Sequence, residues 1–548
     1  MMVALPIFIV LMAVLIGVSM NTRVKWDYEP TGQHLQTLAS STAISFANAN
    51  GEGAANLPAR DTYEVQQHYE TLDVREPSTG DVQHIKILVR EPKAPHVSNL
   101  PGVVFMHGAG YGTCDNSFGD VATALSSAGI VTAVLDKPVW NTNDATRDYP
   151  GSAYAYDQVI NLVRGMSNVD AKKVGIYATS ESTWISSYLL EQDHNIAFQV
   201  LLSPMVFSPR VALGFLAAQD FALAGAHDGY QSIVRRVFSF DTAMFGLTNI
   251  DLNTLNPQAY SIPTLVAYGS KDVMTAQVEG VKEILKNAHE AGNRNVTIRS
   301  YPVANHVLRL GNEANAGTPL ADNYVNDVIA WTNGTADGLK ETTPAIAGSE
   351  LYQSIAVPTD LHAQRSMTIY AVVIHLLMAL MLVVTLIIWL VAVIRWIVDR
   401  VRKRPRHSTL GFQNGFGKAM LTLSVVTMAM LVLFFAGFGE VVMGVVQLAW
   451  GSAPTDDPGV MYWSWPVIQI VCVVVVWAWS LVFRRMIEVA SLRGIAQWPM
   501  RKGAVREIVR GERPVLATTR LGRVLFWVSA ATMFTILLVF AFWGVFVY

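Results

Sequence analysis

The chain has 548 residues, more than one ordinary domain holds, so at least two structural units are expected. Its formal net charge of −2 gives no indication of nucleic-acid binding, and its two cysteines, Cys114 and Cys472, exclude a disulfide framework. Charged residues make up 15% of the chain, against roughly 25% in soluble domains. The deficit lies in residues 367–548, where long apolar runs dominate, whereas residues 21–366 have the composition of a soluble domain.

The first feature along the chain is an apolar run at residues 3–20, close to the length of about 20 residues that crosses a bilayer. The run lacks the basic start and the clean small-residue cleavage site that are typical of a secretory signal peptide. We therefore expect residues 1–22 to form a retained N-terminal membrane anchor. A cleaved signal peptide is the alternative.

The next segments predict a β-sheet that is covered by helices. Residues 63–74 and 82–90 alternate apolar and polar side chains around a Pro-Ser-Thr-Gly-Asp turn, which predicts a hairpin. Short buried strands then alternate with amphipathic helices, which predicts βαβ units and a mostly parallel sheet with helices on both faces. The expected strands are 102–106, 130–135, 174–178, 200–202, 264–268 and 296–300, and the expected helices are 120–128, 154–166, 182–191 and 324–331.

Two segments depart from this alternation. Residues 204–258 contain a long apolar stretch and several phenylalanines, and they follow a strand directly. We expect this insertion to form a lid over the carboxyl edge of the sheet. Residues 334–366 are rich in Gly, Thr, Ala and Pro, and we interpret them as a linker into the membrane. The α/β domain itself is expected to cover residues 60–333.

Three turns after predicted strands carry residues suited to nucleophilic catalysis. Ala178-Thr-Ser-Glu-Ser182 leads from a strand straight into a helix, with Ser180 at its centre and the hydroxyls of Thr179 and Ser182 as alternative nucleophiles. A serine hydroxyl needs a histidine to take its proton, and the histidine needs a carboxylate to fix its tautomer. Asp272 and His306 follow the last two predicted strands, at the edge where parallel strands place their chemistry.

A further turn, His107-Gly-Ala-Gly110, follows the strand at 102–106. Small residues at such a turn let a substrate carbonyl approach the backbone N–H groups. His107 is interpreted as a residue that orders the turn together with Gly108. Cys114, shortly afterwards, is interpreted as a packing residue because no base is placed for it.

Together these features resemble the α/β-hydrolase superfamily, in particular its esterases and lipases. The turn around Ser180 is similar to the Gly-x-Ser-x-Gly nucleophile elbow, with Ala178 and Ser182 at the two glycine positions. The His107 turn is similar to the His-Gly-Gly-Gly turn of lipases, and the chain order Ser180, Asp272, His306 is that of the family. The resemblance implies a sheet of about eight strands and a covalent acyl-enzyme on Ser180. It also implies an oxyanion hole formed by the backbone N–H groups of Ala109, Gly110 and Glu181.

Residues 367–548 predict an all-α bundle of four membrane spans, near 367–394, 419–450, 465–483 and 524–548. Seven Lys and Arg residues lie in the loop at 395–418 and ten in the loop at 484–523, whereas the loop at 451–464 has neither and carries Asp456 and Asp457. Basic loops remain in the cytoplasm, which predicts a plasma-membrane protein with an extracytoplasmic catalytic domain. Arg23 and Lys25, just after the first span, disagree with this orientation because it would place them outside the cytoplasm.

Two ionisable residues fall within these spans, where charges are costly and suggest a function. His375 and Glu440 are expected at a similar depth below the outer surface, where they could pair. Such a pair would form either a structural contact or a polar pocket for a lipid headgroup.

The sequence therefore predicts a membrane-anchored serine hydrolase that cleaves acyl esters of a lipid or glycolipid. Acyl transfer to another hydroxyl is an alternative, peptidase activity is a lesser one, and the departures at Ala178 and Ser182 leave open an inactive receptor or lipid-transport component. No metal or organic cofactor is expected, because neither a Cys/His cluster nor a phosphate-binding Gly loop is found in the sequence.

Overall fold

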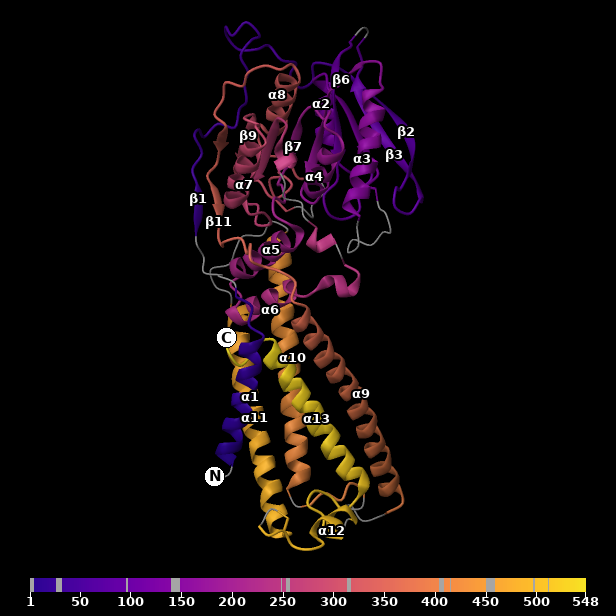
Figure 1. Cartoon of the computed structure of the whole chain (residues 1–548), viewed down its shortest axis with the longest axis vertical. Helices are drawn as coiled ribbons and strands as arrows, with labels where there is room; N and C mark the ends of the chain where they lie inside the picture. The colour runs from indigo at the N-terminus through magenta and orange to yellow at the C-terminus, as the bar shows by residue number, and fades with distance from the viewer. Residues whose placement is uncertain are drawn as a thin grey trace.

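The computed structural model consists of a head that contains a β-sheet and a bundle of long helices beneath it (Figure 1). The structure describes residues 4–25, 32–94, 97–138, 148–247, 249–252, 257–312, 317–403, 409–413, 415–449, 459–495, 498–510 and 512–548. The two units meet at helices α5 (Pro209–Leu223) and α6 (Asp228–Phe238), which lie between the sheet and the bundle.

Nine strands of the described chain form one sheet, in the order β10-β9-β8-β7-β6-β4-β5-β3-β2. Neighbours from β10 to β5 are parallel, whereas β3 is antiparallel to both β5 and β2. The strands are β2 (Val65–Arg75), β3 (Val82–Pro92), β4 (Leu100–Met106), β5 (Val131–Leu135), β6 (Val169–Thr179), β7 (Gln199–Leu202), β8 (Thr264–Gly269), β9 (Val296–Tyr301) and β10 (Ile346–Gly348). This is an α/β-hydrolase fold, so the predicted fold class is confirmed.

Helices cover both faces of the sheet because successive strand residues point to opposite sides. On β4, Val104 joins a core beneath α3 (Tyr149–Arg164), α4 (Ser182–Gln192) and α7 (Gln277–Glu290). Its neighbour Phe105 joins the opposite core beneath α2 (Gly119–Ser127) and α8 (Tyr324–Ala336). Such double burial explains why these strands are continuous apolar runs in the sequence.

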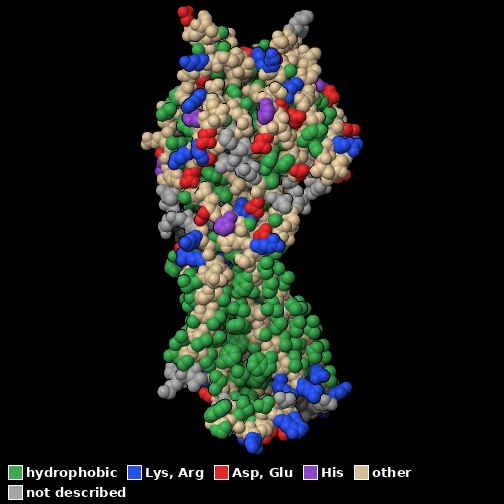
Figure 2. All heavy atoms as spheres, in the orientation of Figure 1, with side chains coloured by type: hydrophobic (Ala, Val, Ile, Leu, Met, Phe, Trp, Pro, Cys, Tyr) green, Lys and Arg blue, Asp and Glu red, His purple; other side chains and the backbone are tan. Residues whose placement is uncertain are grey.

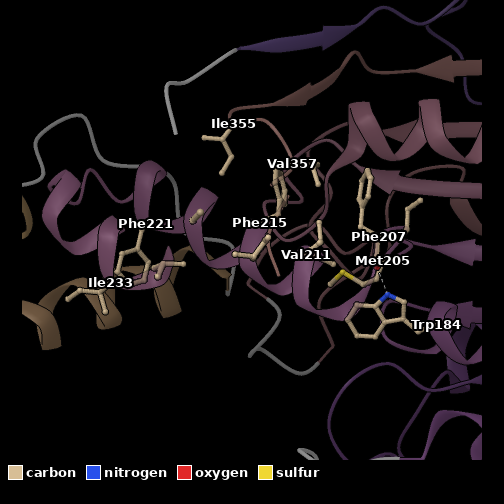
Figure 3. Close-up of a cluster of buried hydrophobic side chains, with 14 of the residues drawn as sticks. Trp184, Met205, Phe207, Val211, Phe215, Phe221, Ile233, Ile355 and Val357 are labelled. Carbon is tan, nitrogen blue, oxygen red and sulfur yellow. Dashed lines mark hydrogen bonds between the residues drawn. The ribbon is translucent and has the colours of Figure 1, made fainter. Parts of the chain in front are cut away.

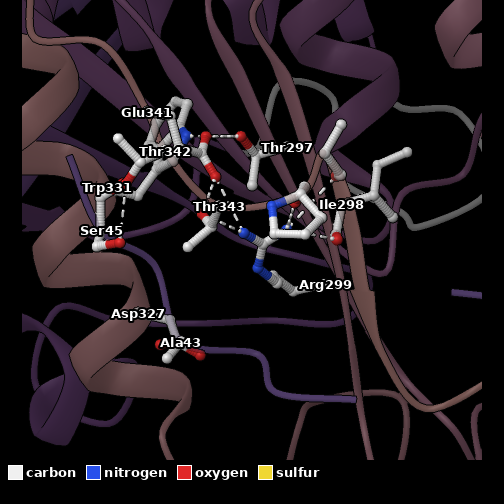
Figure 4. Close-up of polar contacts among 12 residues, drawn as sticks. Ala43, Ser45, Thr297, Ile298, Arg299, Asp327, Trp331, Glu341, Thr342 and Thr343 are labelled. Atoms are coloured by element: carbon white, nitrogen blue, oxygen red, sulfur yellow. Dashed lines mark hydrogen bonds and ion pairs between the residues drawn. The ribbon is translucent and has the colours of Figure 1, made fainter. Parts of the chain in front are cut away.

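The segment 334–366 differs from the linker expected of it. It supplies β10 at the edge of the sheet and β11 (Leu351–Gln353), which pairs with β1 (Gln33–Leu35). Arg299 on β9 is fully buried and binds this segment, donating to the Glu341 carboxylate at 2.9 Å and to the Pro344 carbonyl at 2.9 Å (Figure 4). A three-residue strand gives too short a pattern to be recognised, and its partner arginine lies far away in the sequence.

The lid insertion is helical and is packed on both sides. It contains α5, α6 and three short 3-10 helices, Thr242–Phe245, Asn249–Asp251 and Pro257–Tyr260. Apolar side chains of α5, among them Val211 and Phe215, lie between Trp184 of α4 and Ile233 of α6 (Figure 3). The lid therefore shares one continuous core with the head and with the bundle.

Five helices of the described chain are long and apolar enough to cross a membrane, and all five coincide with the predicted spans. They are α1 (Ala4–Asn21), α9 (Arg365–Val401), α10 (Phe416–Ala449), α11 (Val460–Leu492) and α13 (Arg520–Phe542). A short helix, α12 (Ala504–Arg510), lies in the loop between the last two. Asp456 and Asp457 of the predicted acidic loop lie outside the described residues.

Candidate active site

The nucleophile candidate sits on a sharp turn between β6 and α4. Ser180 follows the last residue of β6 and adopts a φ of 50°, a left-handed conformation that costs a non-glycine residue about 1–3 kcal/mol. Its N–H donates to the Leu202 carbonyl of the neighbouring strand β7 at 2.9 Å, which holds the turn in place. The strain turns the serine side chain out of the strand, as a nucleophile elbow requires.

The two departures from the glycine pattern are accommodated without opening the turn. Ala178 is fully buried within β6, where its methyl group packs in the core. Ser182 uses its hydroxyl as a bridge, because Oγ accepts the Thr179 N–H at 2.7 Å and donates to the Met106 carbonyl at 2.9 Å. Ser182 thus ties the elbow to the end of β4, and its hydroxyl is engaged with the backbone.

The structure brings the three predicted catalytic side chains together at the carboxyl edge of the sheet. Ser180 Oγ lies 2.9 Å from His306 Nε2, and His306 Nδ1 lies 3.0 Å from Asp272 Oδ1. Asp272 follows β8, and His306 follows β9, where its carbonyl accepts a hydrogen bond from Ser203 Oγ at 2.7 Å. All three residues are buried, and Ser180 is 7% exposed.

The acid of this group is held ionised. Burial pushes the pKa of Asp272 upwards, but the charge of His306 and the hydrogen bonds around the carboxylate outweigh it, so the pKa lies below its usual value. The Thr275 hydroxyl donates to Oδ2 at 2.6 Å, and the Met274 N–H donates to Oδ1 at 2.8 Å. A carboxylate fixed in this way can orient His306 and stabilise its imidazolium form.

The predicted oxyanion turn lies directly against the elbow. A Cβ atom placed on Gly108 would lie 3.5 Å from Ser180 Cβ and 3.3 Å from the Thr179 carbonyl oxygen, so the two turns are in contact. Ala109 and Gly110 are exposed, and Gly110 has a φ of 84° that favours glycine. The backbone of the turn is therefore exposed at Ala109 and Gly110.

His107 and Cys114 have the structural surroundings of packed residues. Burial lowers the pKa of His107 to about 4, and its Nε2 lies 2.5 Å from the Leu135 carbonyl oxygen. The neutral ring therefore donates to Leu135 and orders the turn. Cys114 is fully buried, and burial raises the pKa of its thiol to about 12, which keeps it in the unreactive thiol form.

Sequence reasoning missed two buried ionisable groups beside this site. Lys137, two residues after β5, donates to the Glu181 carboxylate at 2.8 Å, and Tyr149 donates to the same carboxylate at 3.2 Å. For Lys137, the available signal in the sequence was its position just after β5, a strand that neighbours β4. Asp220 of α5 is fully buried, and neither of its carboxylate oxygens has a hydrogen-bond partner among the described residues.

The structure does not bring His375 and Glu440 together. His375 Nε2 accepts a hydrogen bond from Trp543 Nε1 at 2.9 Å, and its Nδ1 lies 2.7 Å from the Ala371 carbonyl of its own helix. Glu440 is exposed on α10. The expected pairing is wrong because α9 packs along α13 rather than along α10. Among the described residues, no group of three or more His, Cys, Asp or Glu side chains could hold a metal ion.

Comparison with known proteins adds a similarity of fold. No family model matches the chain, and no curated protein matches its sequence. An esterase structure from Rhizomucor miehei is 17% identical over 50% of this chain and 85% of its own, with a TM-score of 0.35. Brefeldin A esterase, a bacterial homologue of human hormone sensitive lipase, is 16% identical over 52% of this chain and 81% of its own, with a TM-score of 0.34. A dipeptidyl aminopeptidase IV-like protein from Bacteroides ovatus is 12% identical over 56% of this chain, with a TM-score of 0.35, and this chain spans 43% of that protein's length.

Proposed function

We propose that this protein is a membrane-anchored serine hydrolase that cleaves acyl esters of a lipid or glycolipid. The observation that carries the proposal is the hydrogen-bonded series from Ser180 through His306 to Asp272, which lies beneath a lid docked on helices that are long and apolar enough to span a membrane. A buried hydroxyl, imidazole and carboxylate in this order are suited to acyl transfer and have no evident structural purpose at a strained turn.

The geometry supports a two-step reaction. Ser180 Oγ attacks the ester carbonyl carbon while its proton passes to His306 Nε2, and the carbonyl oxygen becomes an oxyanion near the N–H groups of Ala109, Gly110 and Glu181. The carbon–oxygen bond to the alcohol then breaks, and His306 returns the proton to the leaving alcohol. A water molecule, deprotonated by His306, attacks the acyl-enzyme in the same way and releases the acid, and Ser180 regains its proton.

The position of the lid supports a substrate that comes from the membrane. Near the C-terminal end of α5, Gln219 donates to the Val273 carbonyl in the acid turn at 2.7 Å. Ala224, the residue after this helix, lies against Gly444 of α10, since a Cβ atom on this glycine would lie 3.7 Å from the Ala224 methyl group. The C-terminal end of one lid helix therefore contacts the acid turn and leads to the bundle, which supports a site that faces the bundle.

Contacts of the second lid helix support the same docking. Tyr230 Oη and Ser464 Oγ of α11 lie 2.8 Å apart, and the His227 ring stacks on Trp465 at 6.2 Å between centroids. Gly229 packs so closely that a Cβ atom there would lie 1.8 Å from the Trp465 ring. We propose that an amphiphilic ester from the outer leaflet reaches the site around the outside of this packed junction, with its chains remaining in apolar surroundings.

The charge distribution supports an extracytoplasmic head. Basic side chains gather at the end of the bundle remote from the head (Figure 2), which is the end that carries α12 and the turns from α9 to α10 and from α11 to α13. If this end lies in the cytoplasm, the head lies outside, and the plasma membrane is the proposed location.

A labelling experiment tests the chemistry in the full-length protein in detergent micelles. Wild-type protein should react covalently with a fluorophosphonate and hydrolyse a short soluble ester, whereas Ser180→Ala should lose labelling and about 10⁴-fold or more of the turnover. Ser45→Ala, at an exposed serine of the head, is the matched control and should retain both. Folded wild-type protein that neither reacts nor hydrolyses would favour a receptor or transport role.

A lipid substrate is tested separately. Extracted membrane lipids should release fatty acid on incubation with wild-type protein and not with Ser180→Ala. A long-chain alcohol or a sugar added as acceptor should leave the products unchanged if water is the acceptor. A new ester formed from the added hydroxyl would identify acyl transfer instead.

A further inference from the structure

A buried lysine links both halves of the proposed oxyanion hole. Lys137 is 2% exposed, and its Nζ donates to the Gly108 carbonyl, to the Gly110 carbonyl at 3.0 Å and to the Glu181 carboxylate at 2.8 Å. Two of these partners belong to the turn after β4, and the third follows Ser180 on the elbow. One ammonium group thus binds the backbone of the first segment and the side chain of Glu181 in the second, and it links the two segments whose N–H groups would face the oxyanion.

The direction of these hydrogen bonds matters because a trans peptide unit is planar. The C=O of one residue and the N–H of the next point in opposite directions across that plane. When Lys137 binds the Gly108 carbonyl from one side, the N–H of Ala109 is aimed to the other side. A peptide unit in an exposed turn would otherwise be free to rotate, since neighbouring φ and ψ angles compensate at small cost, above all at glycine.

Lys137 itself is rigidly placed. Its own N–H donates to the Gly112 carbonyl at 2.9 Å, and the preceding residue, Asp136, accepts the Cys114 N–H at 2.8 Å. These contacts fix the end of β5 to the far side of the oxyanion turn. Glu181 is fixed in turn, because Tyr149 of α3 donates to its second carboxylate oxygen at 3.2 Å.

We propose that Lys137 is a positioning residue that orients the oxyanion-hole N–H group of Ala109 and holds its turn against Glu181 on the elbow, an inference that rests on the proposed serine hydrolase function. Its charge is balanced by Glu181 at 2.8 Å, so its contribution is to hold geometry rather than to attract the oxyanion directly. Preorganised donors stabilise the transition state more than the ground state, so loss of their orientation lowers kcat rather than raising KM.

Three variants of the full-length protein test the proposal. Lys137→Met removes the three hydrogen bonds and leaves Glu181 without this partner, and Lys137→Met/Glu181→Gln removes the charge of both, which avoids a buried unpaired carboxylate. Lys173→Met is the matched control, because Lys173 forms an exposed ion pair with Asp337 on the same domain. Thermal unfolding is measured for each variant to establish that the compared proteins are folded.

The expected result is a fall in kcat of about 10- to 100-fold for the double variant on a short soluble ester, with KM within about threefold, and no change for Lys173→Met. Affinity for a trifluoromethyl ketone, which forms an anionic tetrahedral adduct on serine, should fall in parallel with kcat/KM. If Lys137 had a purely structural role, the inhibitor affinity and kcat/KM would not fall in parallel.

Two failures are distinguishable. Wild-type protein that neither hydrolyses esters nor reacts with fluorophosphonate would remove the proposed function and this inference with it. Active wild-type protein together with a folded double variant of unchanged kcat and unchanged inhibitor affinity would overturn the inference alone.

Discussion

The head and the bundle hold their polar side chains in different ways. In the head, the Asp272 carboxylate accepts hydrogen bonds from His306, Thr275 and Met274, and each of these partners comes from a turn fixed by the sheet. In the bundle, polar contacts between helices are more scattered, such as the 2.6 Å contact between Thr385 and Thr532 of α9 and α13. The carboxyl edge of the sheet is therefore held by many mutually supporting contacts, whereas apolar packing dominates the association of the helices.

The largest effect on activity is expected for Asp272→Asn in the head. An amide would keep the size of the side chain but could stabilise the wrong tautomer of His306, so we expect kcat to fall about 10³- to 10⁴-fold. Steady-state hydrolysis of a short soluble ester measures the effect. Asp73→Asn, at an exposed strand residue that contacts His84, is the matched control. Comparable activity of the two variants would mean that the acid of the site is a different residue.

The same contrast explains what the sequence could predict. Parallel strands place their carboxyl ends along one edge, so Ser180, Asp272 and His306 could be assigned to one site from chain order alone. Chain order does not determine which helices are neighbours in a bundle. The His375 side chain therefore accepts a hydrogen bond from Trp543 rather than pairing with Glu440. Lys137 was missed because its partners are backbone carbonyls, which no residue pattern records.

Gly229→Ala addresses the junction between the two regions. The added Cβ would meet the Trp465 ring at 1.8 Å, and overpacking of this kind costs about 1–3 kcal/mol. We expect turnover of a long-chain ester in mixed micelles to fall about tenfold, because the lid can no longer dock on α11 in the same way. Turnover of a short soluble ester should change less.

Gly439→Ala on α10 is the control for this substitution, since a Cβ atom there meets nothing within 4 Å. Equal losses on long and short esters in Gly229→Ala would indicate a general packing defect and would argue against a role of the junction in substrate delivery.

A comparison within the bundle should give a smaller effect. His375→Ala removes the acceptor of the Trp543 hydrogen bond, and we expect the free energy of unfolding in detergent to fall by about 1 kcal/mol. Glu440→Gln, at an exposed position, should change it by less than about 0.5 kcal/mol. A selective loss of turnover on amphiphilic esters in Glu440→Gln would instead restore the idea of a headgroup pocket at that residue.

The smallest effect on activity is expected at Asp220 of the lid, whose effect on stability depends on pH. Burial, reinforced by the negative charge of Asp272, raises the pKa of Asp220 well above its usual value, although His306 partly offsets the rise. The native state therefore keeps a proton that the unfolded chain releases. The contribution of Asp220 to the free energy of unfolding consequently falls as the pH rises above the carboxyl pKa of the unfolded chain. Asp220→Asn is neutral at every pH, and we expect turnover near neutrality within about twofold of wild type, equal to about 0.4 kcal/mol.

The same variant should differ from wild type in the pH dependence of its stability. Its melting temperature should exceed that of wild type at neutral pH, and the difference should disappear under acidic conditions, where both side chains are neutral. Melting curves of the two proteins across this pH range measure the difference. A difference of the opposite sign would mean that Asp220 is ionised in the folded protein. The lid would then bring a second negative charge towards His306, and its removal should shift the pH profile of kcat/KM to lower pH, because a negative charge near the imidazole favours its protonated form.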